Sequence, residues 1–277
     1  DPVVKYWPEF GQNGKESISL EQLLTHTSGL RDQINPQVKW CDYPGALDAI
    51  AVDKTIPWKT RFKYSDVDFI VLGEIVQRLA NQSLDRYCTE NIFQPLQMDK
   101  TTFNPPETWL PGIAPCNKIN GNWLWGKVQD PDARKFGGVA GHAGLFSTAN
   151  DLAKFAQMVL NGGESQGKHI LSAKAVAAMT RPQIIAETSN TINHGFGWDM
   201  LSPFSKDFNT SFPLGSFGHT GYTGTSIWID PHSKTYLIIL TNRLHPDSHG
   251  QVKPLRAKIS AAVAAAVPML PPVGTLE

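Results

Sequence analysis

The chain has little cysteine, no excess of either charge and no long hydrophobic run. Its three cysteines are widely spaced over 277 residues and form no C-x-x-C pair. Three cysteines cannot all pair with one another, so the cysteine content does not indicate whether the protein is found in an oxidising or a reducing compartment. The 25 basic and 25 acidic residues cancel without a long run of either sign, which gives no indication of a nucleic-acid partner or an anionic membrane surface. The longest apolar stretches, such as residues 259–270, are alanine-rich and too short to span a bilayer.

Several chemical signatures are also missing. The sequence contains no H-E-x-x-H motif, no G-x-S-x-G motif, no repeat and no low-complexity segment. His142 stands among glycines and is interpreted as a turn residue. His245 and His249 have an i, i+4 spacing, but they follow a predicted strand and a proline lies between them, so a metal site there is disfavoured. We expect neither a metal site nor another cofactor.

The sequence does contain enough apolar material for a sizeable core. It is 41% hydrophobic and 18% charged, which argues against disorder and fits one large domain or two small ones. Three- and four-residue apolar periods and capping signals predict helices near residues 19–28, 45–52, 66–80, 83–93, 148–160, 172–179 and from Pro254 onward. Strands are predicted at 196–200, 217–220, 225–230 and 235–241.

Residues 104–140 show neither a helical nor a strand period. Three tryptophans, Trp109, Trp123 and Trp125, lie there among prolines and glycines. A long loop without regular structure inside a compact domain is usually functional or a lid. We therefore predict that Trp123 and Trp125 bind substrate from the wall of a cleft, since aromatic surface supplies binding area at little entropic cost.

The stretch 218–230 passes from a glycine-rich segment into an alternating apolar run. Ile227 and Ile229 fall on one side and Trp228 on the other, and residues 231–234 then lead into a second apolar strand. This pattern predicts a β-hairpin near the middle of a sheet. The glycines at 218, 221 and 224 indicate either a place where a ligand approaches the backbone closely or a glycine-rich turn entering the hairpin.

Four ordered motifs together resemble a known superfamily. They are Tyr64-Ser65-Asp66, His219-Thr220-Gly221, the run L-L-T-H-T-S-G-L at residues 23–30 and the run G-G-V-A-G-H-A-G-L-F-S-T-A at 137–149. Nearly the whole chain resembles the serine β-lactamase and penicillin-binding protein superfamily, and within it the class C-like branch of β-lactamases, DD-peptidases and esterases.

The resemblance implies an α/β (α+β) fold of the β-lactamase/transpeptidase type. Such a fold has an antiparallel sheet flanked by helices, together with a mainly helical subdomain. Residues 1–277 are then expected to form a single, N-terminally incomplete domain. Residues 31–180 would make the helical subdomain, and residues 181–277 the sheet subdomain with its C-terminal helix.

The resemblance also implies the catalytic roles. Tyr64 stands at the tyrosine of the family's Y-x-N motif, and His219 stands in its K-T-G or H-T-G motif. Because tyrosine ordinarily titrates near ~10, Tyr64 can act as a base at neutral pH only beside cations, which a lysine and His219 could supply. His219 is expected to offer a cation or a donor to a substrate carboxylate or to the tyrosine. The backbone N–H of Tyr222 is expected to form half of an oxyanion hole.

Three further residues are expected to contact substrate. Thr220 and Gly221 continue the H-T-G motif along the cleft strand. Asp66 replaces the usual asparagine of Y-x-N, and an ionised aspartate cannot donate the hydrogen bond that asparagine donates. Ser65 is interpreted as a helix cap because Asp68 follows it at the capping spacing.

The family's S-x-x-K nucleophile has no counterpart of the right kind in this sequence. The only S-x-x-K here is Ser165-Gln166-Gly167-Lys168, in a glycine-rich connection that cannot hold serine and lysine on one face as a helical turn does. We therefore expect the nucleophile on a segment upstream of Asp1. Without two further strands from that segment, residues 235–241 would become an apolar sheet edge, and residues 1–277 alone would be poorly soluble and hydrolytically silent.

Two function classes follow from these features. The first is a serine hydrolase that acts by acyl-enzyme chemistry on cell-wall peptide, β-lactam or ester substrates. The second is a non-catalytic module of the same fold that binds a peptide or a partner. The expected partners are a small-molecule or peptidoglycan-peptide substrate and the chain's own N-terminal segment, with no nucleic acid and no membrane span. By resemblance the protein is expected to be periplasmic or otherwise extracytoplasmic.

Overall fold

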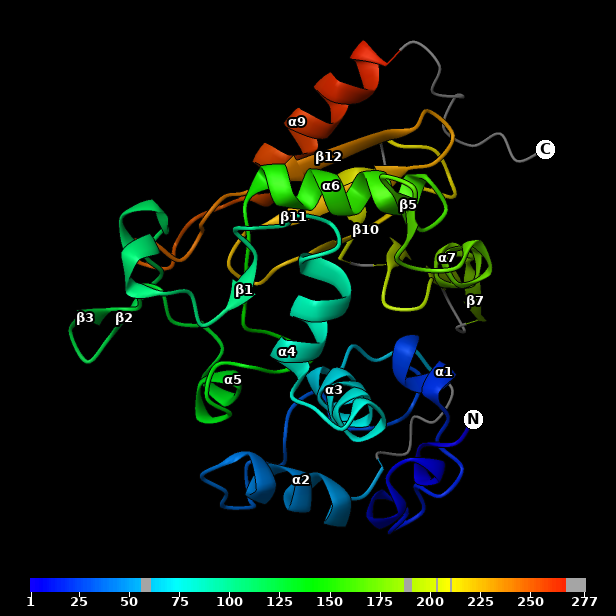
Figure 1. Ribbon diagram of the computed structural model, residues 1–277, viewed down its shortest axis with the longest axis vertical. Helices are drawn as coiled ribbons and strands as arrows, with labels where there is room; N and C mark the ends of the chain where they lie inside the picture. Colours follow the sequence, from blue (N-terminus) through cyan, green and yellow to red (C-terminus); the bar gives the residue numbers. More distant parts are fainter. Residues whose placement is uncertain (56–60, 187–190, 203, 210, 268–277) are drawn as a thin grey trace.

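The computed structural model describes residues 1–55, 61–186, 191–202, 204–209 and 211–267. Helices precede most of the strands along the chain (Figure 1). The α-helices are α1 (Leu20–Leu24), α2 (Tyr43–Val52), α3 (Asp66–Ala80), α4 (Leu84–Cys88), α5 (Pro131–Lys135), α6 (Ala149–Leu160), α7 (Ala173–Thr180), α8 (Lys206–Asn209) and α9 (Lys253–Ala266). A π-helical segment, Thr89–Phe93, extends α4, and 3₁₀ turns lie at Val3–Lys5, Pro8–Phe10 and Glu107–Gly112.

The helix starts follow the capping signals in the sequence. Ser19 and Gln22 form a reciprocal capping box at α1. Ser65 accepts from the Asp68 N–H at 3.2 Å and begins α3, and Thr148 accepts from the Asp151 N–H at 3.2 Å and begins α6. Because each cap satisfies backbone donors that the helix itself leaves unpaired, it fixes where the helix starts. The cap at Ser65 thereby sets the position of its neighbours Tyr64 and Asp66.

One six-stranded antiparallel sheet forms the main β-structure. Its strands are β7 (Gln183–Ala186), β8 (Thr191–His194), β9 (Asp199–Leu201), β10 (Phe217–Thr220), β11 (Ser226–Asp230) and β12 (Thr235–Ile239), in the order β12-β11-β10-β9-β8-β7. The predicted hairpin of β11 and β12 is confirmed, with Asp230 opposite Thr235, but it lies at one end of the described sheet and not near its middle. The expectation of an α/β (α+β) fold with an antiparallel sheet flanked by helices is also confirmed. Within the described chain β12 is an edge strand.

The two faces of the sheet bury separate cores. Ile229 on β11 packs with Met158 and Val159 of α6. Its neighbour Trp228 points to the opposite face, where it stacks on Phe208 of α8 with ring centroids 4.7 Å apart and packs near Ile259 of α9. Successive strand residues point to opposite faces, so α6 and α9 cover opposite sides of the sheet (Figure 1).

The segment 104–140 is more ordered than the sequence indicates. It contains the 3₁₀ turn Glu107–Gly112, the short hairpin of β2 (Lys118–Ile119) and β3 (Asn122–Trp123), and α5. The expectation of a loop without regular structure is therefore wrong, because these elements are too short to produce a visible period. Two more short pairs join β1 (Thr102–Phe103) to β4 (Leu145–Phe146) and β5 (Glu164–Ser165) to β6 (Lys168–His169). None of the helices among the described residues has the length and hydropathy needed to cross a membrane.

Candidate active site

A cleft of about 1480 Å³ lies between the helical part of the chain and the β10–β11 end of the sheet. Six of the eight residues predicted from sequence line it: Tyr64, Asp66, His219, Thr220, Gly221 and Tyr222. The Tyr64 and His219 ring centroids are 6.1 Å apart. The structure thus brings the Tyr64 segment and the start of the hairpin, which are more than 150 residues apart in sequence, onto facing walls.

Trp123 and Trp125 do not line the cleft. Their predicted contact with substrate therefore has no support from their position in the structure. The Trp123 ring packs on His245, with centroids 4.4 Å apart, and the Trp125 Nε1–H donates to the Ile113 carbonyl at 2.7 Å. Trp109 is the tryptophan of this segment that reaches the cleft, with the Lys100 ammonium 4.4 Å from its ring centroid. The cleft wall does come from residues 104–140, but from a different aromatic side chain.

Replacing Trp109 by alanine in the full-length protein should raise KM by about tenfold, because a half-buried ring and its cation contact are lost from the wall. Trp123→Ala removes the same side chain outside the cleft and should change KM by less than about twofold. Steady-state kinetics on one ester substrate would compare the two variants. A larger effect from Trp123→Ala would show that the cleft is not where substrate binds.

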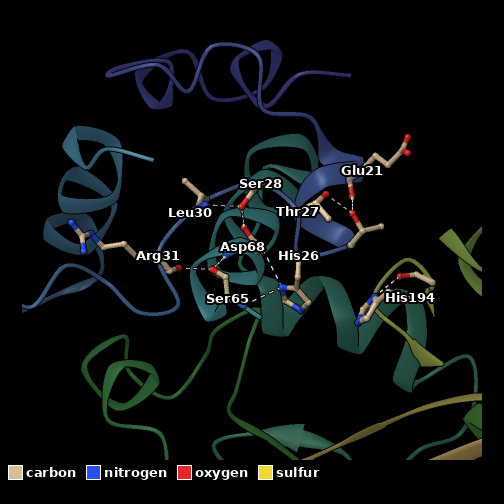
Figure 2. A network of polar contacts seen from close by, with 11 residues as sticks. Glu21, His26, Thr27, Ser28, Leu30, Arg31, Ser65, Asp68 and His194 are labelled. Carbon is tan, nitrogen blue, oxygen red and sulfur yellow. Dashed lines mark hydrogen bonds and ion pairs between the residues drawn. The ribbon is translucent and has the colours of Figure 1, made fainter. Parts of the chain in front are cut away.

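Figure 2 shows a buried polar network around His26, a residue whose ring packs on Tyr64. The Ser28 hydroxyl donates to Asp68 Oδ1 at 2.5 Å, and His26 Nδ1 lies 3.0 Å from Asp68 Oδ2. All three side chains are buried, and the His26 ring packs on the Tyr64 ring with centroids 4.5 Å apart. The run at residues 23–30 therefore contributes a platform under the tyrosine. A serine, a histidine and an aspartate meet here, but the serine contacts the carboxyl group and not the imidazole, so the group is not arranged as a catalytic triad.

The proton positions in this network can be assigned from its contacts. The Ser65 backbone N–H donates to His26 Nδ1 at 3.2 Å, so this nitrogen is an acceptor and the shared proton lies on the Asp68 carboxyl group. Burial favours the same neutral forms: it raises the pKa of Asp68 well above its ordinary value and lowers the pKa of His26 to about 4. The contacts and the direction of the pKa shift both favour the protonated, neutral form of Asp68.

Tyr222 lines the cleft two residues after the end of β10. Its side chain is 68% exposed and stacks under Arg243, whose Nε–H donates to the Tyr222 carbonyl at 2.6 Å. Within the described part of the chain its backbone N–H donates to no other group. A free N–H at this place is suited to the oxyanion that the sequence predicts there.

Three glycines near this hairpin have neighbours from the chain itself. A Cβ on Gly218 would lie 2.2 Å from the Ile227 carbonyl oxygen, and one on Gly221 would lie 2.3 Å from Thr225 Oγ1. Gly224 has φ +118°, which only glycine adopts readily. The close packing of β10 on β11 explains Gly218, the turn entering the hairpin explains Gly224, and Gly221 also lines the cleft.

A family model described as Beta-lactamase matches residues 1–262. The chain belongs to the β-lactamase family. Its relatives include an Escherichia coli protein provisionally named D-alanyl-D-alanine carboxypeptidase, 32% identical over 282 residues, which cover 88% of this chain and 63% of that protein. A Salmonella agona protein with the same provisional name is 32% identical over 289 residues, or 92% of this chain and 65% of that protein. The chain spans less than two thirds of the length of these curated relatives.

Solved structures agree on the β-lactamase fold. A family VIII carboxylesterase superposes with a TM-score of 0.70 at 18% identity, covering 95% of this chain and 75% of that one. A penicillin-binding protein homologue from Caulobacter crescentus gives a TM-score of 0.69 at 20% identity, covering 95% and 76%. These comparisons confirm the superfamily and the fold that the four motifs indicate.

The charges in this β-lactamase-family cleft differ from the expectation. Burial lowers the pKa of His219 to about 4, so its ring is neutral at pH 7 and the expected cation is absent. Its Nδ1 lies 3.1 Å from the Thr220 carbonyl oxygen, which can only accept, so Nδ1 carries the proton and Nε2 is an acceptor. Burial, followed by the negative charges of Asp66 and Asp199, raises the pKa of Tyr64 above its ordinary value. Tyr64 is therefore a neutral phenol at pH 7.

The structure also places acidic and histidine side chains in the cleft that the sequence reasoning missed. Asp130 and His142 line it beside Asp66, and His142 Nε2 lies 3.0 Å from Asp130 Oδ1. Burial raises the pKa of Asp66; the nearby His142 opposes this shift, and Asp130 adds to it. The motif that could have revealed His142 is the glycine run at 137–144. His142 was instead interpreted as a turn residue.

Proposed function

We propose that this chain forms the substrate cleft of a serine hydrolase that works through an acyl-enzyme on cell-wall peptides, β-lactams or esters. Tyr64 relays protons, the Tyr222 N–H stabilises the oxyanion, and Asp66, Thr220 and Gly221 contact the substrate. The nucleophilic serine and its lysine come from a segment outside residues 1–277. The protein acts outside the cytoplasm, where peptidoglycan lies.

The juxtaposition of Tyr64 with the first turn of the hairpin carries this proposal. Tyr64, His219 and Tyr222 all line one cleft, and the Tyr64 and His219 ring centroids are 6.1 Å apart. A proton relay and an oxyanion donor on facing walls are what acyl transfer requires of a cleft. The provisional names of the Escherichia coli and Salmonella relatives support a peptide substrate, and the likeness to a family VIII carboxylesterase supports an ester.

A non-catalytic binding module remains the second candidate because of where Ser165 and Lys168 lie. They pair with each other across the β5–β6 hairpin, so they are not held one helical turn apart. Ser165 and Lys168 therefore do not form the nucleophile and base pair that acyl transfer needs. A fold that keeps the cleft without a nucleophile would still bind a peptide.

Mass spectrometry of the full-length protein separates the two candidates. After incubation with a penicillin or a fluorophosphonate, a serine hydrolase should gain the mass of one acyl or phosphonyl group per chain. Heat-denatured protein is the control for non-specific labelling. If native protein gains no mass from either reagent at saturating concentration, the hydrolase proposal is wrong and the binding module is favoured.

A further inference from the structure

Three side chains in the cleft point potential metal-ligand atoms toward one another, and the proposed acyl transfer gives no reason for this arrangement. Asp66 is the first residue of α3, Asp130 is the N-cap of α5, and His142 lies in the turn before β4. One potential ligand atom from each lies within 4.8 Å of the corresponding atoms of the other two. We refer to this group as the Asp66–Asp130–His142 cluster.

His142 is buried without a hydrogen-bond partner outside this cluster. Its side chain is only 4% exposed, and its one hydrogen bond within the described residues is the contact with Asp130. Its Nδ1 is buried and has no partner among them. Nε2, the nitrogen that contacts Asp130, is therefore the atom that His142 offers to a ligand held between the three side chains, and one ring carbon separates it from Nδ1.

Asp66 adds a second carboxylate that lacks a cation. Within the described residues its carboxylate makes no hydrogen bond and no ion pair, and it lies beside the carboxylate of Asp130. The basic side chain of the cluster is His142, which Asp130 already contacts. Two neighbouring carboxylates repel each other in a half-buried cleft, and either protonation of one of them or a bound cation relieves this repulsion.

The fold holds the three donors in place before any ligand arrives. A Cβ on Gly141 would lie 2.0 Å from the Phe69 carbonyl oxygen, so only glycine lets the turn carrying His142 pack directly on α3. Asp130 is fixed because its Oδ1 also accepts from the Ala133 N–H at 2.7 Å, as the cap of α5. Donors held by rigid elements in this way are typical of metal sites.

We propose that Asp66, Asp130 and His142 bind a divalent transition-metal ion of the Zn²⁺ class. One imidazole and two carboxylates are a usual donor set for such an ion, and the imidazole disfavours Ca²⁺ and Mg²⁺. The 3.0 Å between His142 Nε2 and Asp130 Oδ1 fits two adjacent ligands, each about 2.1 Å from one ion. The cleft leaves the remaining positions open to water. The site contrasts with the expectation from sequence that no metal binds, and it does not depend on the proposed hydrolase activity.

Calorimetric titration tests the site directly. Full-length protein treated with EDTA and dialysed should bind one Zn²⁺ per chain and should melt at a higher temperature with ZnCl₂, while CaCl₂ should have no comparable effect. Asp66→Asn and His142→Ala should each weaken Zn²⁺ binding by at least tenfold, since losing a ligand costs no less than disturbing an outer partner of one. Binding that is not saturable, or that both variants retain at full affinity, would overturn the proposal.

Two matched variants control for charge and for stray histidine binding. Asp132→Asn removes a charge from the same helix as Asp130, but Asp132 faces Lys135 at 3.6 Å and belongs to no part of the cluster. His169→Ala removes an exposed histidine on β6. Both should keep Zn²⁺ affinity within about threefold, and an equal loss in either would count against the site. Should His142→Ala fail to fold, crystals of the unmodified protein soaked in ZnCl₂ decide, because an anomalous-scattering peak must lie between the three side chains.

Discussion

Replacing Tyr64 by phenylalanine in the full-length enzyme should lower kcat by roughly 10²- to 10⁴-fold, the usual contribution of a group that moves protons in the transition state. The ring stays, so its packing on His26 and its position opposite His219 are preserved. Only the phenol oxygen and its proton are lost. The loss should therefore appear in kcat at fixed pH, with the melting temperature unchanged.

A second tyrosine supplies the comparison for this experiment. Tyr87 on α4 is half-buried but does not line the cleft, so Tyr87→Phe removes the same hydroxyl group at a place without chemistry. Single-turnover acylation with a penicillin or an ester would measure both variants on the same scale. If Tyr64→Phe acylates as fast as the unmodified enzyme, Tyr64 does not relay protons.

Replacing Asp68 by alanine should cost about 3 kcal/mol of unfolding free energy. The change leaves the Ser28 O–H without its acceptor in a fully buried place and removes one of the two polar contacts of His26 Nδ1, which keeps the Ser65 N–H. An unsatisfied buried polar group typically costs about 1–3 kcal/mol. Asp68→Asn should cost less than about 1 kcal/mol. A neutral carboxylic acid and an amide have the same shape, and both can accept from Ser28 and donate to His26. Urea denaturation at pH 7 would measure both losses.

The pH dependence of the unfolding free energy, measured for Asp68→Asn and for the unmodified protein, tests whether Asp68 is neutral. Its folded-state pKa is raised, so its contribution to stability is complete below its unfolded pKa and is lost as pH rises through the folded pKa. Asparagine does not titrate. The stability of Asp68→Asn relative to the unmodified protein should therefore improve as pH is raised from about 4 toward 7. If alanine and asparagine are equally harmful, or if the difference does not change with pH, Asp68 is an ionised carboxylate.

Local features of this fold could be predicted well from sequence. The cap at Ser65, the apolar period of α3 and the alternation of Ile227, Trp228 and Ile229 each depend on residues within a few positions of one another. Some short elements were missed because their formation depends on residues far away in sequence. The strands β7 and β8 have four residues each, too few for a period, and depend on pairing with the rest of the sheet.

The site could be predicted in its composition but not in its charges. The resemblance placed Tyr64 and His219 in one cleft, which the structure shows. The protonation state of His219 depends on burial by segments far away in sequence, and no local pattern reports that burial. Asp130 and His142 were missed in the same way, since they lie beside Asp66 through contacts between segments far apart in sequence, such as the packing of Gly141 on Phe69. Trp123 and Trp125 show the reverse error, because aromatic content does not say which side of a hairpin faces the cleft.

The network at Asp68 closes a long loop, and this has a consequence for the evolution of the segment it encloses. Ser28 and Asp68 are 40 residues apart in sequence, and the exposed turn around Pro36 and Gln37 lies between them. Adding about ten residues at that turn would raise the entropic cost of loop closure by only about 0.2 kcal/mol. The buried contacts outweigh this cost many times over. The fold can accordingly accept insertions at this turn without moving the tyrosine.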